Sequence, residues 1–164
     1  MTPLQNTWVI WYHDQGNDWS INGFKKLYEI KTIENFWEIY LKLNNYIMLK
    51  GMFFLMKKGI EPRWETEPNI NGGSWSYKIN KNEAFISWLY LSIYLCGENL
   101  IRDNSIDNEN TDIINGLSIS PKKNFCIIKI WNNNYLKKNN NILVDSINNL
   151  KLSSCLFKAH KDRN

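Results

Sequence analysis

The chain has 164 residues, of which 43% are hydrophobic and 22% charged, and its net charge at pH 7 is +4. This length and composition predict one globular domain over residues 1–164 and exclude a disordered or fibrous protein. The longest apolar run, residues 84–95, is too short to cross a membrane, and residues 1–8 lack the basic and apolar regions of a secretory signal.

Strands are predicted from runs of β-branched and aromatic residues, and helices from apolar residues at helical spacing. The elements are expected, in chain order, as strands over residues 7–12 and 26–30, a helix over 33–43, strands over 51–58 and 74–79, a helix over 82–95, strands over 113–120 and 125–131, a helix over 142–152 and a strand over 155–160. Strands in meander order with three helices between them predict an α+β fold. The helices would cover one face of an antiparallel sheet and leave the other face free.

Two helices carry apolar residues outside their expected core stripes. Ile33 and Trp37 fall on the flank of the first helix, which Thr32 is predicted to cap. The second helix is apolar almost all round, so its side with Leu89 and Ile93 needs cover or a partner.

Charge is distributed unevenly along the chain. Residues 1–97 carry +1, residues 98–112 carry −4 in an expected acidic loop, and the remainder carries +7. The basic C-terminal third indicates either an anionic ligand on one side of the molecule or a solubilising face.

Two tryptophans lie in predicted loops, where core packing does not require them. Trp19 and Trp64 either pack inward or sandwich a flat ring between their indoles, and a cationic ring would be favoured further. Glu65 could accept the two adjacent N–H donors of a guanine edge. Lys122, Lys123 and Lys129 supply positive charge for phosphates. Together these residues suit 7-methylguanosine at the end of capped mRNA.

Other chemistries find little support in the sequence. His13 and His160 are the only histidines, and neither has metal-ligand spacing, so no metal site or cofactor is expected. The three cysteines lie in apolar runs without CxxC spacing, which predicts inert, reduced thiols in a cytoplasmic protein. No nucleotide-binding or nucleophile motif is present, so we expect a protein that is not an enzyme.

The sequence resembles the eukaryotic translation initiation factor 4E family, the mRNA cap-binding proteins, from Pro3 to about His160. The matching motifs are PLQNTWVIWY, TIENFWEIY, GIEPRWETEPNINGGSW and the run IIKIW. Every tryptophan falls where the family has one: Trp8, Trp11, Trp19, Trp37, Trp64, Trp75, Trp88 and Trp131. The resemblance implies a curved sheet with three helices on its convex face. The abundance of Asn, Lys and Ile fits a protist parasite or a large DNA virus. We expect a cytoplasmic protein, which would act in the host cytoplasm if it is viral.

The resemblance also implies roles for individual residues. Trp19 and Trp64 would sandwich the methylated base, and Glu65 would accept its N1–H and N2–H groups. Trp131 would contact the N7 methyl group, and Lys122 would bind phosphate. On the opposite surface, the helical motif of an initiation factor 4G-like scaffold or of a binding-protein repressor would contact Pro3, Ile33, Trp37, Leu89 and Ile93.

Three departures from the family pattern bear on phosphate and RNA binding. Ile127 stands where the family has a phosphate-binding Lys, and we expect Lys129, on the same strand face, to compensate. Ser74 replaces a basic residue. The sequence ends at Asn164, before most of the family's C-terminal loop, which puts contacts to the second nucleotide in doubt.

The sequence therefore predicts a monomeric protein without membrane association that binds the 7-methylguanosine cap and recruits a scaffold to start translation. One alternative is a cap-binding decoy or repressor that does not recruit ribosomes. Another is a generic single-stranded RNA-binding module in which the two tryptophans stack on any base.

Overall fold

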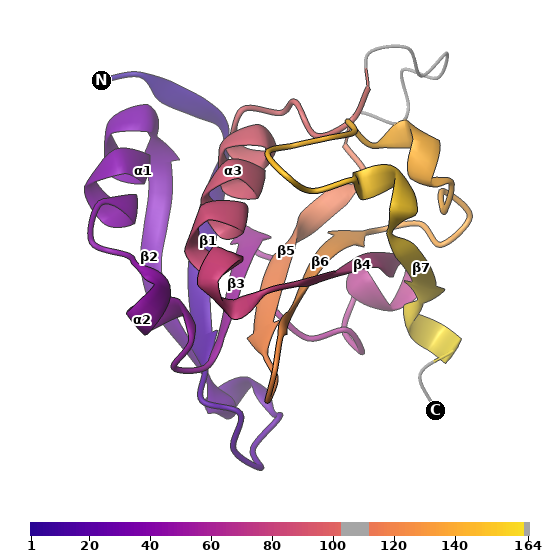
Figure 1. Ribbon diagram of the computed structural model, residues 1–164, viewed down its shortest axis with the longest axis horizontal. Helices are drawn as coiled ribbons and strands as arrows, with labels where there is room; N and C mark the ends of the chain where they lie inside the picture. Colours follow the sequence, from indigo (N-terminus) through magenta and orange to yellow (C-terminus); the bar gives the residue numbers. More distant parts are fainter. Residues whose placement is uncertain (103–111, 163–164) are drawn as a thin grey trace.

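The computed structural model describes residues 1–102 and 112–162 (Figure 1). Most of the expected acidic loop, residues 103–111, lies outside them. In the described part, seven strands form one antiparallel sheet in the order β2-β1-β3-β5-β6-β4-β7. The strands are β1 (Pro3–His13), β2 (Phe24–Thr32), β3 (Met52–Lys57), β4 (Gly73–Ile79), β5 (Ile114–Pro121), β6 (Cys126–Asn132) and β7 (Leu156–Ala159).

The predicted meander order is wrong for one strand. β4 pairs with β6 and β7 instead of with β3, which precedes it in the chain. A direct hairpin between β3 and β4 would need a short turn, whereas residues 58–72 form a long connection that carries the chain beyond β6. This connection contains Trp64 and Glu65, so the crossover itself brings those residues to the sheet.

Three α-helices in the described residues lie on one face of the sheet: α1 (Ile33–Tyr40), α2 (Asn45–Met48) and α3 (Ala84–Cys96) (Figure 1). The Thr32 cap is confirmed, because its Oγ accepts from the Asn35 backbone N–H at 3.0 Å. The first predicted helix ends early, at Tyr40, since Asn44 begins the separate α2 by accepting from the Ile47 N–H at 3.0 Å.

The prediction of a helix over residues 142–152 is wrong. This segment contains a bridge between Ile147 and Leu150, and short 3-10 turns adjoin it. Ser146 and Asn148 have positive φ angles, which a right-handed helix does not allow. The apolar residues are nevertheless buried as the pattern predicted, because the irregular segment packs them against the same core (Leu143, Ile147, Leu150 and Leu152).

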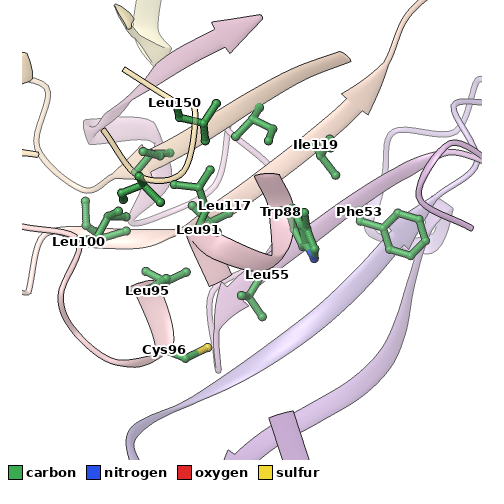
Figure 2. Close-up of a cluster of buried hydrophobic side chains, with 14 of the residues drawn as sticks. Phe53, Leu55, Trp88, Leu91, Leu95, Cys96, Leu100, Leu117, Ile119 and Leu150 are labelled. Carbon is green, nitrogen blue, oxygen red and sulfur yellow. The ribbon is translucent and has the colours of Figure 1, made fainter. Parts of the chain in front are cut away.

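The main core lies between the helices and the sheet (Figure 2). Trp88 of α3 is completely buried there, with Leu55 of β3 and Leu117 of β5 in the same cluster. A buried tryptophan of this kind contributes about 3–5 kcal/mol to the free energy of unfolding. The packing of α3 against β3 and β5 therefore covers this face of the sheet.

The opposite face of the sheet carries a smaller cluster of Phe24, Phe54, Met56 and Trp131. Trp64 packs against it from the connection between β3 and β4. No α-helix of the described residues covers this cluster, since all three lie on the other face (Figure 1). The cluster forms the base on which the candidate site is built.

Candidate functional site

A cavity of about 470 Å³ lies over this smaller cluster and unites most of the predicted site residues. It is bounded by the loop between β1 and β2, by the connection between β3 and β4, and by β5 and β6. Its lining includes Trp19, Trp64, Glu65, Lys122, Ile127, Lys129 and Trp131. Lys123 is exposed in the β5–β6 turn and does not line the cavity.

Trp19 is 48% exposed, and its indole stacks on the imidazole of His13. The ring centroids are 3.8 Å apart and the planes are inclined by 11°. The His13 Nδ1 accepts from the Gln15 backbone N–H at 2.8 Å, and its Nε2 donates to the Asp18 carbonyl at 2.7 Å. One neutral tautomer satisfies both bonds. His13 therefore supports one face of the indole, and the exposed part of the ring lies toward the cavity.

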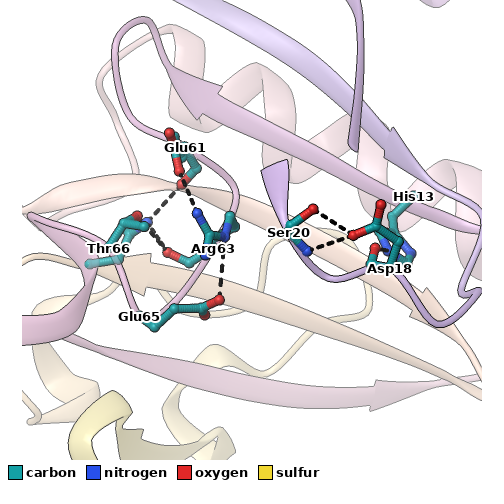
Figure 3. Close-up of polar contacts among 8 residues, drawn as sticks. His13, Asp18, Ser20, Glu61, Arg63, Glu65 and Thr66 are labelled. Carbon is teal, nitrogen blue, oxygen red and sulfur yellow. Dashed lines mark hydrogen bonds and ion pairs between the residues drawn. The ribbon is translucent and has the colours of Figure 1, made fainter. Parts of the chain in front are cut away.

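The loop that carries Trp19 is braced by Asp18 and Ser20 (Figure 3). The Asp18 carboxylate accepts from the Ser20 hydroxyl at 2.5 Å and from its backbone N–H at 3.0 Å. These two hydrogen bonds lower the pKa of Asp18, because they favour the ionised form. The loop thus keeps a negative charge next to Trp19.

Glu65 is held by the side chain before Trp64 (Figure 3). Arg63 Nε donates to Glu65 Oε1 at 3.3 Å, and Arg63 Nη1 donates to Glu61 Oε2 at 3.2 Å. One guanidinium therefore joins two carboxylates of the same loop. Since Glu65 bonds Arg63 through one oxygen only, its carboxylate retains acceptor capacity for a ligand.

The backbone of the Trp64 loop is fixed by a buried amide. Asn69 is fully buried, and its Nδ2 donates to the carbonyls of Glu61 and Arg63 at 2.8 and 2.9 Å. Its Oδ1 accepts from Asn115 of β5 at 2.9 Å, and its own carbonyl accepts from His160 Nδ1 at 2.6 Å. Buried polar groups with complete partners order their surroundings, so this network ties the loop to the sheet.

The base of the cavity is formed by Trp131, which is 6% exposed. Its Nε1 donates to the Ser118 hydroxyl at 3.0 Å, and the Phe54 ring meets it edge-on. These contacts fix the indole plane. Lys122 and Lys129 approach the cavity from the β5–β6 hairpin and make that side basic.

The two substitutions expected to weaken phosphate binding differ in position. Ile127 lines the cavity together with Lys129, two residues further along β6, as the strand periodicity predicted. Ser74 is completely buried outside the cavity lining, and its hydroxyl donates to His160 Nε2 at 2.7 Å. Ser74 therefore supports the buried network rather than facing a ligand.

A second surface lies on the helix side of the molecule. An apolar groove of about 200 Å³ is lined by Leu4, Ile33, Phe36, Trp37, Ile93, Cys96 and Gly97. Ile33, Trp37 and Ile93 are 44, 42 and 37% exposed, as expected for residues outside the core stripes. Pro3 pairs with Thr32 beside the start of α1, and Leu89 is half-buried one turn before Ile93; neither lines the groove.

Sequence reasoning missed the residues that position the ring and the carboxylate. In the sequence His13 stands out only as a histidine without metal-ligand spacing, and nothing distinguishes Asn69 and Asn115 from the many other asparagines. The spacing of Glu61, Arg63 and Glu65 around Trp64 was a usable signal, because alternating charges on one short loop can pair. The buried amides gave no such signal, because their partners come from distant strands.

Burial explains the state of the cysteines. Cys96, Cys126 and Cys155 are free and buried, and desolvation raises the pKa of each thiol, that of Cys155 to about 12. Within residues 1–102 and 112–162, no helix has the length and apolarity needed to cross a membrane.

Comparison with known proteins agrees with this architecture. Residues 3–164 match the family described as Eukaryotic initiation factor 4E. The Xenopus laevis eukaryotic translation initiation factor 4E is 31% identical over 144 residues, which cover 83% of this chain and 64% of that protein. The chain spans between about half and two thirds of the length of the curated relatives it matches.

Two solved structures resemble the fold. Ascaris suum eIF4E-3 in complex with an m2,2,7G cap is 28% identical, with a TM-score of 0.70 and coverage of 83% of this chain and 76% of that chain. Caenorhabditis elegans eIF4E-3 in complex with the 4E-binding protein Mextli and a cap analog is 26% identical, with a TM-score of 0.77 and coverage of 98 and 94%.

Proposed function

Because the chain belongs to the eukaryotic initiation factor 4E family, we propose that its cavity binds the 7-methylguanosine cap of mRNA. The observation that carries this proposal is the meeting of two indoles, one carboxylate and two lysines in a single cavity of about 470 Å³. The cap-bound Ascaris suum relative supports it.

Base recognition would depend on charge. Methylation at N7 makes the guanine ring cationic, so stacking between Trp19 and Trp64, at roughly 1–3 kcal/mol per ring contact, gains about 0.5–2 kcal/mol of cation–π attraction. Glu65 would accept the N1–H and N2–H donors of the base, the Trp64 backbone N–H would meet its O6, and Trp131 would contact the methyl group.

The phosphate chain would leave the base toward the β5–β6 hairpin. Lys122 and Lys129 line that side of the cavity and would neutralise phosphate charge. Lys123, which lies outside the lining, would add to the local positive potential without direct contact with the base.

The groove between α1 and α3 would receive a helical segment of an initiation factor 4G-like scaffold or of a binding-protein repressor. Its apolar lining and the exposed Trp37 fit the apolar face of an amphipathic helix. The Mextli complex of the Caenorhabditis elegans relative supports a protein partner. Through this groove the protein would start translation in the cytoplasm as a monomer, acting as an adaptor without catalysis.

The proposal is tested by titration with 7-methyl-GTP and with GTP while tryptophan fluorescence is followed. We expect strong quenching by the methylated nucleotide and weaker binding of GTP by at least about tenfold, which corresponds to 1.4 kcal/mol. Trp64→Ala should abolish the response, whereas Trp37→Ala, on the other side of the molecule, should retain it. Equal affinity for the two nucleotides would instead favour a generic single-stranded RNA-binding module.

The adaptor role needs a separate test. A helical peptide of a 4G-like scaffold should bind the unaltered chain together with 7-methyl-GTP. Addition of the protein alone to a translation extract should raise capped translation, and the peptide should suppress that rise because it occupies the groove without recruiting ribosomes. Cap binding combined with inhibition of translation would identify a decoy or repressor.

A further inference from the structure

The 3-10 turn that follows β7 packs against the base of the cavity. Its first residue, His160, is completely buried, and the His160 backbone N–H donates to the Gly72 carbonyl at 2.9 Å. The imidazole ring lies beside the Trp131 indole, with centroids 5.1 Å apart and planes inclined by 60°. This turn is thus joined to the residue that forms the cavity base.

Both ring nitrogens of His160 are bonded. Nδ1 donates to the Asn69 carbonyl at 2.6 Å, since a carbonyl can only accept, and Nε2 accepts from the Ser74 hydroxyl at 2.7 Å. Asn69 in turn donates to two carbonyls of the loop that carries Trp64. One imidazole therefore contacts Trp131 directly and reaches the Trp64 loop through a single intervening residue.

Strand pairing places His160 at this position. Ser74 of β4 pairs with Trp131 of β6, and paired residues of an antiparallel sheet point to the same side. Ser74 also pairs with Lys158 of β7, two residues before His160. The hydrogen bond from Ser74 therefore fixes the imidazole on the side of the sheet to which the Trp131 indole points.

His160 differs from two other side chains that contact Trp131. Phe54 and Ser118 line the cavity themselves, so their substitution changes the cavity wall. His160 does not line the cavity. An effect of His160 on a ligand in the cavity must therefore pass through Trp131 or Asn69.

The position of Trp131 matters because the contact it would make has a short range. The residue is 6% exposed, so only a small part of the indole reaches the cavity. A gap of about 0.5–1 Å already removes about a quarter to a half of the dispersion attraction between two atoms. Loss of the imidazole should therefore weaken the contact with an N7 methyl group, and a base without that group has no such contact to lose.

We propose that His160 is a positioning residue that determines the preference for the N7-methylated base by fixing the Trp131 indole. This inference rests on the proposed function, in which Trp131 contacts the methyl group. It also gives Ser74 a role, because the Ser74 hydroxyl supplies the proton that His160 Nε2 accepts.

The test uses two substitutions of His160 and one control. His160→Asn removes the ring but retains an amide donor for the Asn69 carbonyl, whereas His160→Phe retains a ring beside Trp131 but removes both side-chain hydrogen bonds. The control is Phe157→Leu in β7, whose ring packs against Trp75 in the main core. Each protein is titrated with 7-methyl-GTP and with GTP, and its urea unfolding curve is measured.

The two nucleotides should respond differently to the loss of the ring. His160→Asn should weaken 7-methyl-GTP binding about five- to tenfold and GTP binding less than about twofold, because one methyl group in a fitted apolar contact contributes about 10- to 200-fold and only part of it is lost. His160→Phe should restore the preference for 7-methyl-GTP, although both nucleotides bind more weakly because the Asn69 carbonyl loses its donor. Phe157→Leu should lower the free energy of unfolding and leave both affinities unchanged.

A second measurement does not depend on a nucleotide. The Trp131 indole N–H, which donates to the Ser118 hydroxyl, gives a resonance in a ¹H–¹⁵N spectrum that is assigned by its absence in Trp131→Phe. This resonance should shift in His160→Asn and keep its position in Phe157→Leu. A shift confined to the His160 variant would show that the imidazole fixes the indole.

The outcomes separate the inference from the proposed function. If His160→Asn leaves the ratio of the two affinities unchanged, or the Trp131 resonance does not move, the inference is wrong and the cap site stands. If the unaltered chain does not prefer 7-methyl-GTP, the proposed function is wrong and the inference falls with it. If His160→Asn does not fold, Ser74→Ala, which removes only the hydroxyl, replaces it and should lower the same ratio; an unchanged ratio in Ser74→Ala would then overturn the inference.

Discussion

Glu65→Gln isolates the charge on which base recognition is proposed to depend. The amide has nearly the same shape as the carboxylate but presents one acceptor and one NH₂ group to the two N–H donors of guanine. A hydrogen bond to a charged group contributes about 1.5–3 kcal/mol, so affinity for 7-methyl-GTP should fall by about 10- to 100-fold. GTP, whose base is neutral, should lose less, so the preference for the methylated nucleotide should shrink.

The structure predicts that this substitution leaves the fold intact. Arg63 loses its 3.3 Å contact with Glu65 but keeps Glu61 at 3.2 Å. Because these side chains are partly exposed, the lost ion pair should cost at most about 1 kcal/mol of stability. A urea unfolding curve measured beside the fluorescence titration checks this expectation.

Glu61→Gln is the matched control for the same loop. It removes the other carboxylate bonded to Arg63, but Glu61 does not line the cavity. We expect its effect on 7-methyl-GTP affinity to stay below about fivefold, the equivalent of a surface ion pair. Equal losses in both variants, or an unchanged nucleotide preference in Glu65→Gln, would refute direct readout of the base by Glu65.

Three further predictions concern the groove, the buried network and the thiols. Trp37→Ala should weaken binding of a scaffold-type helical peptide, measured by fluorescence anisotropy, by at least about 2 kcal/mol. Its affinity for 7-methyl-GTP should stay unchanged, because the groove is separate from the cavity. Loss of cap affinity in this variant would contradict the assignment of Trp37 to the groove. Asn69→Ala leaves the carbonyls of two loop residues unpaired, so it should lower the free energy of unfolding by about 1–3 kcal/mol and weaken 7-methyl-GTP binding. The control is Asn140→Ala, which removes a loop-bracing amide outside the cavity lining and should lower stability alone. Burial raises the pKa of Cys155 from 9.0 to about 12, so this thiol ionises in the unfolded chain first. As pH rises from 9 towards 12, the free energy of unfolding should therefore fall by about 1.4 kcal/mol per pH unit for each such thiol. Cys155→Ala should make that fall shallower, and an unchanged slope would exclude the Cys155 thiol as its cause.

The sequence predicted most elements because their signals are local. Thr32 is a capping residue followed by a helical stripe, and the structure contains that cap. The outward position of Ile33 and Trp37 follows from helical geometry alone, since 3.6 residues per turn determine which side chains share a face. The same holds for Ile127 and Lys129, because strand periodicity places them on one face and both line the cavity.

The errors arose where distant contacts outweigh local preference. Residues 142–152 have a helical pattern of apolar residues, yet positive φ angles at Ser146 and Asn148 and packing against the core produce an irregular segment. The position of β4 beside β6 depends on pairing between strands far apart in the chain, which periodicity within one strand does not encode.

By itself, the sequence determined the kinds of residue in the site: two loop tryptophans, a carboxylate beside one of them, and lysines on the β5–β6 hairpin. The tertiary structure decided how they are held. His13 stacks on Trp19, Arg63 binds Glu65, and Asn69 joins the Trp64 loop to β5 through Asn115. These contacts join residues from separate elements, and their geometry exists only when the chain is folded, because the relative positions of distant segments depend on how strands pair and side chains pack.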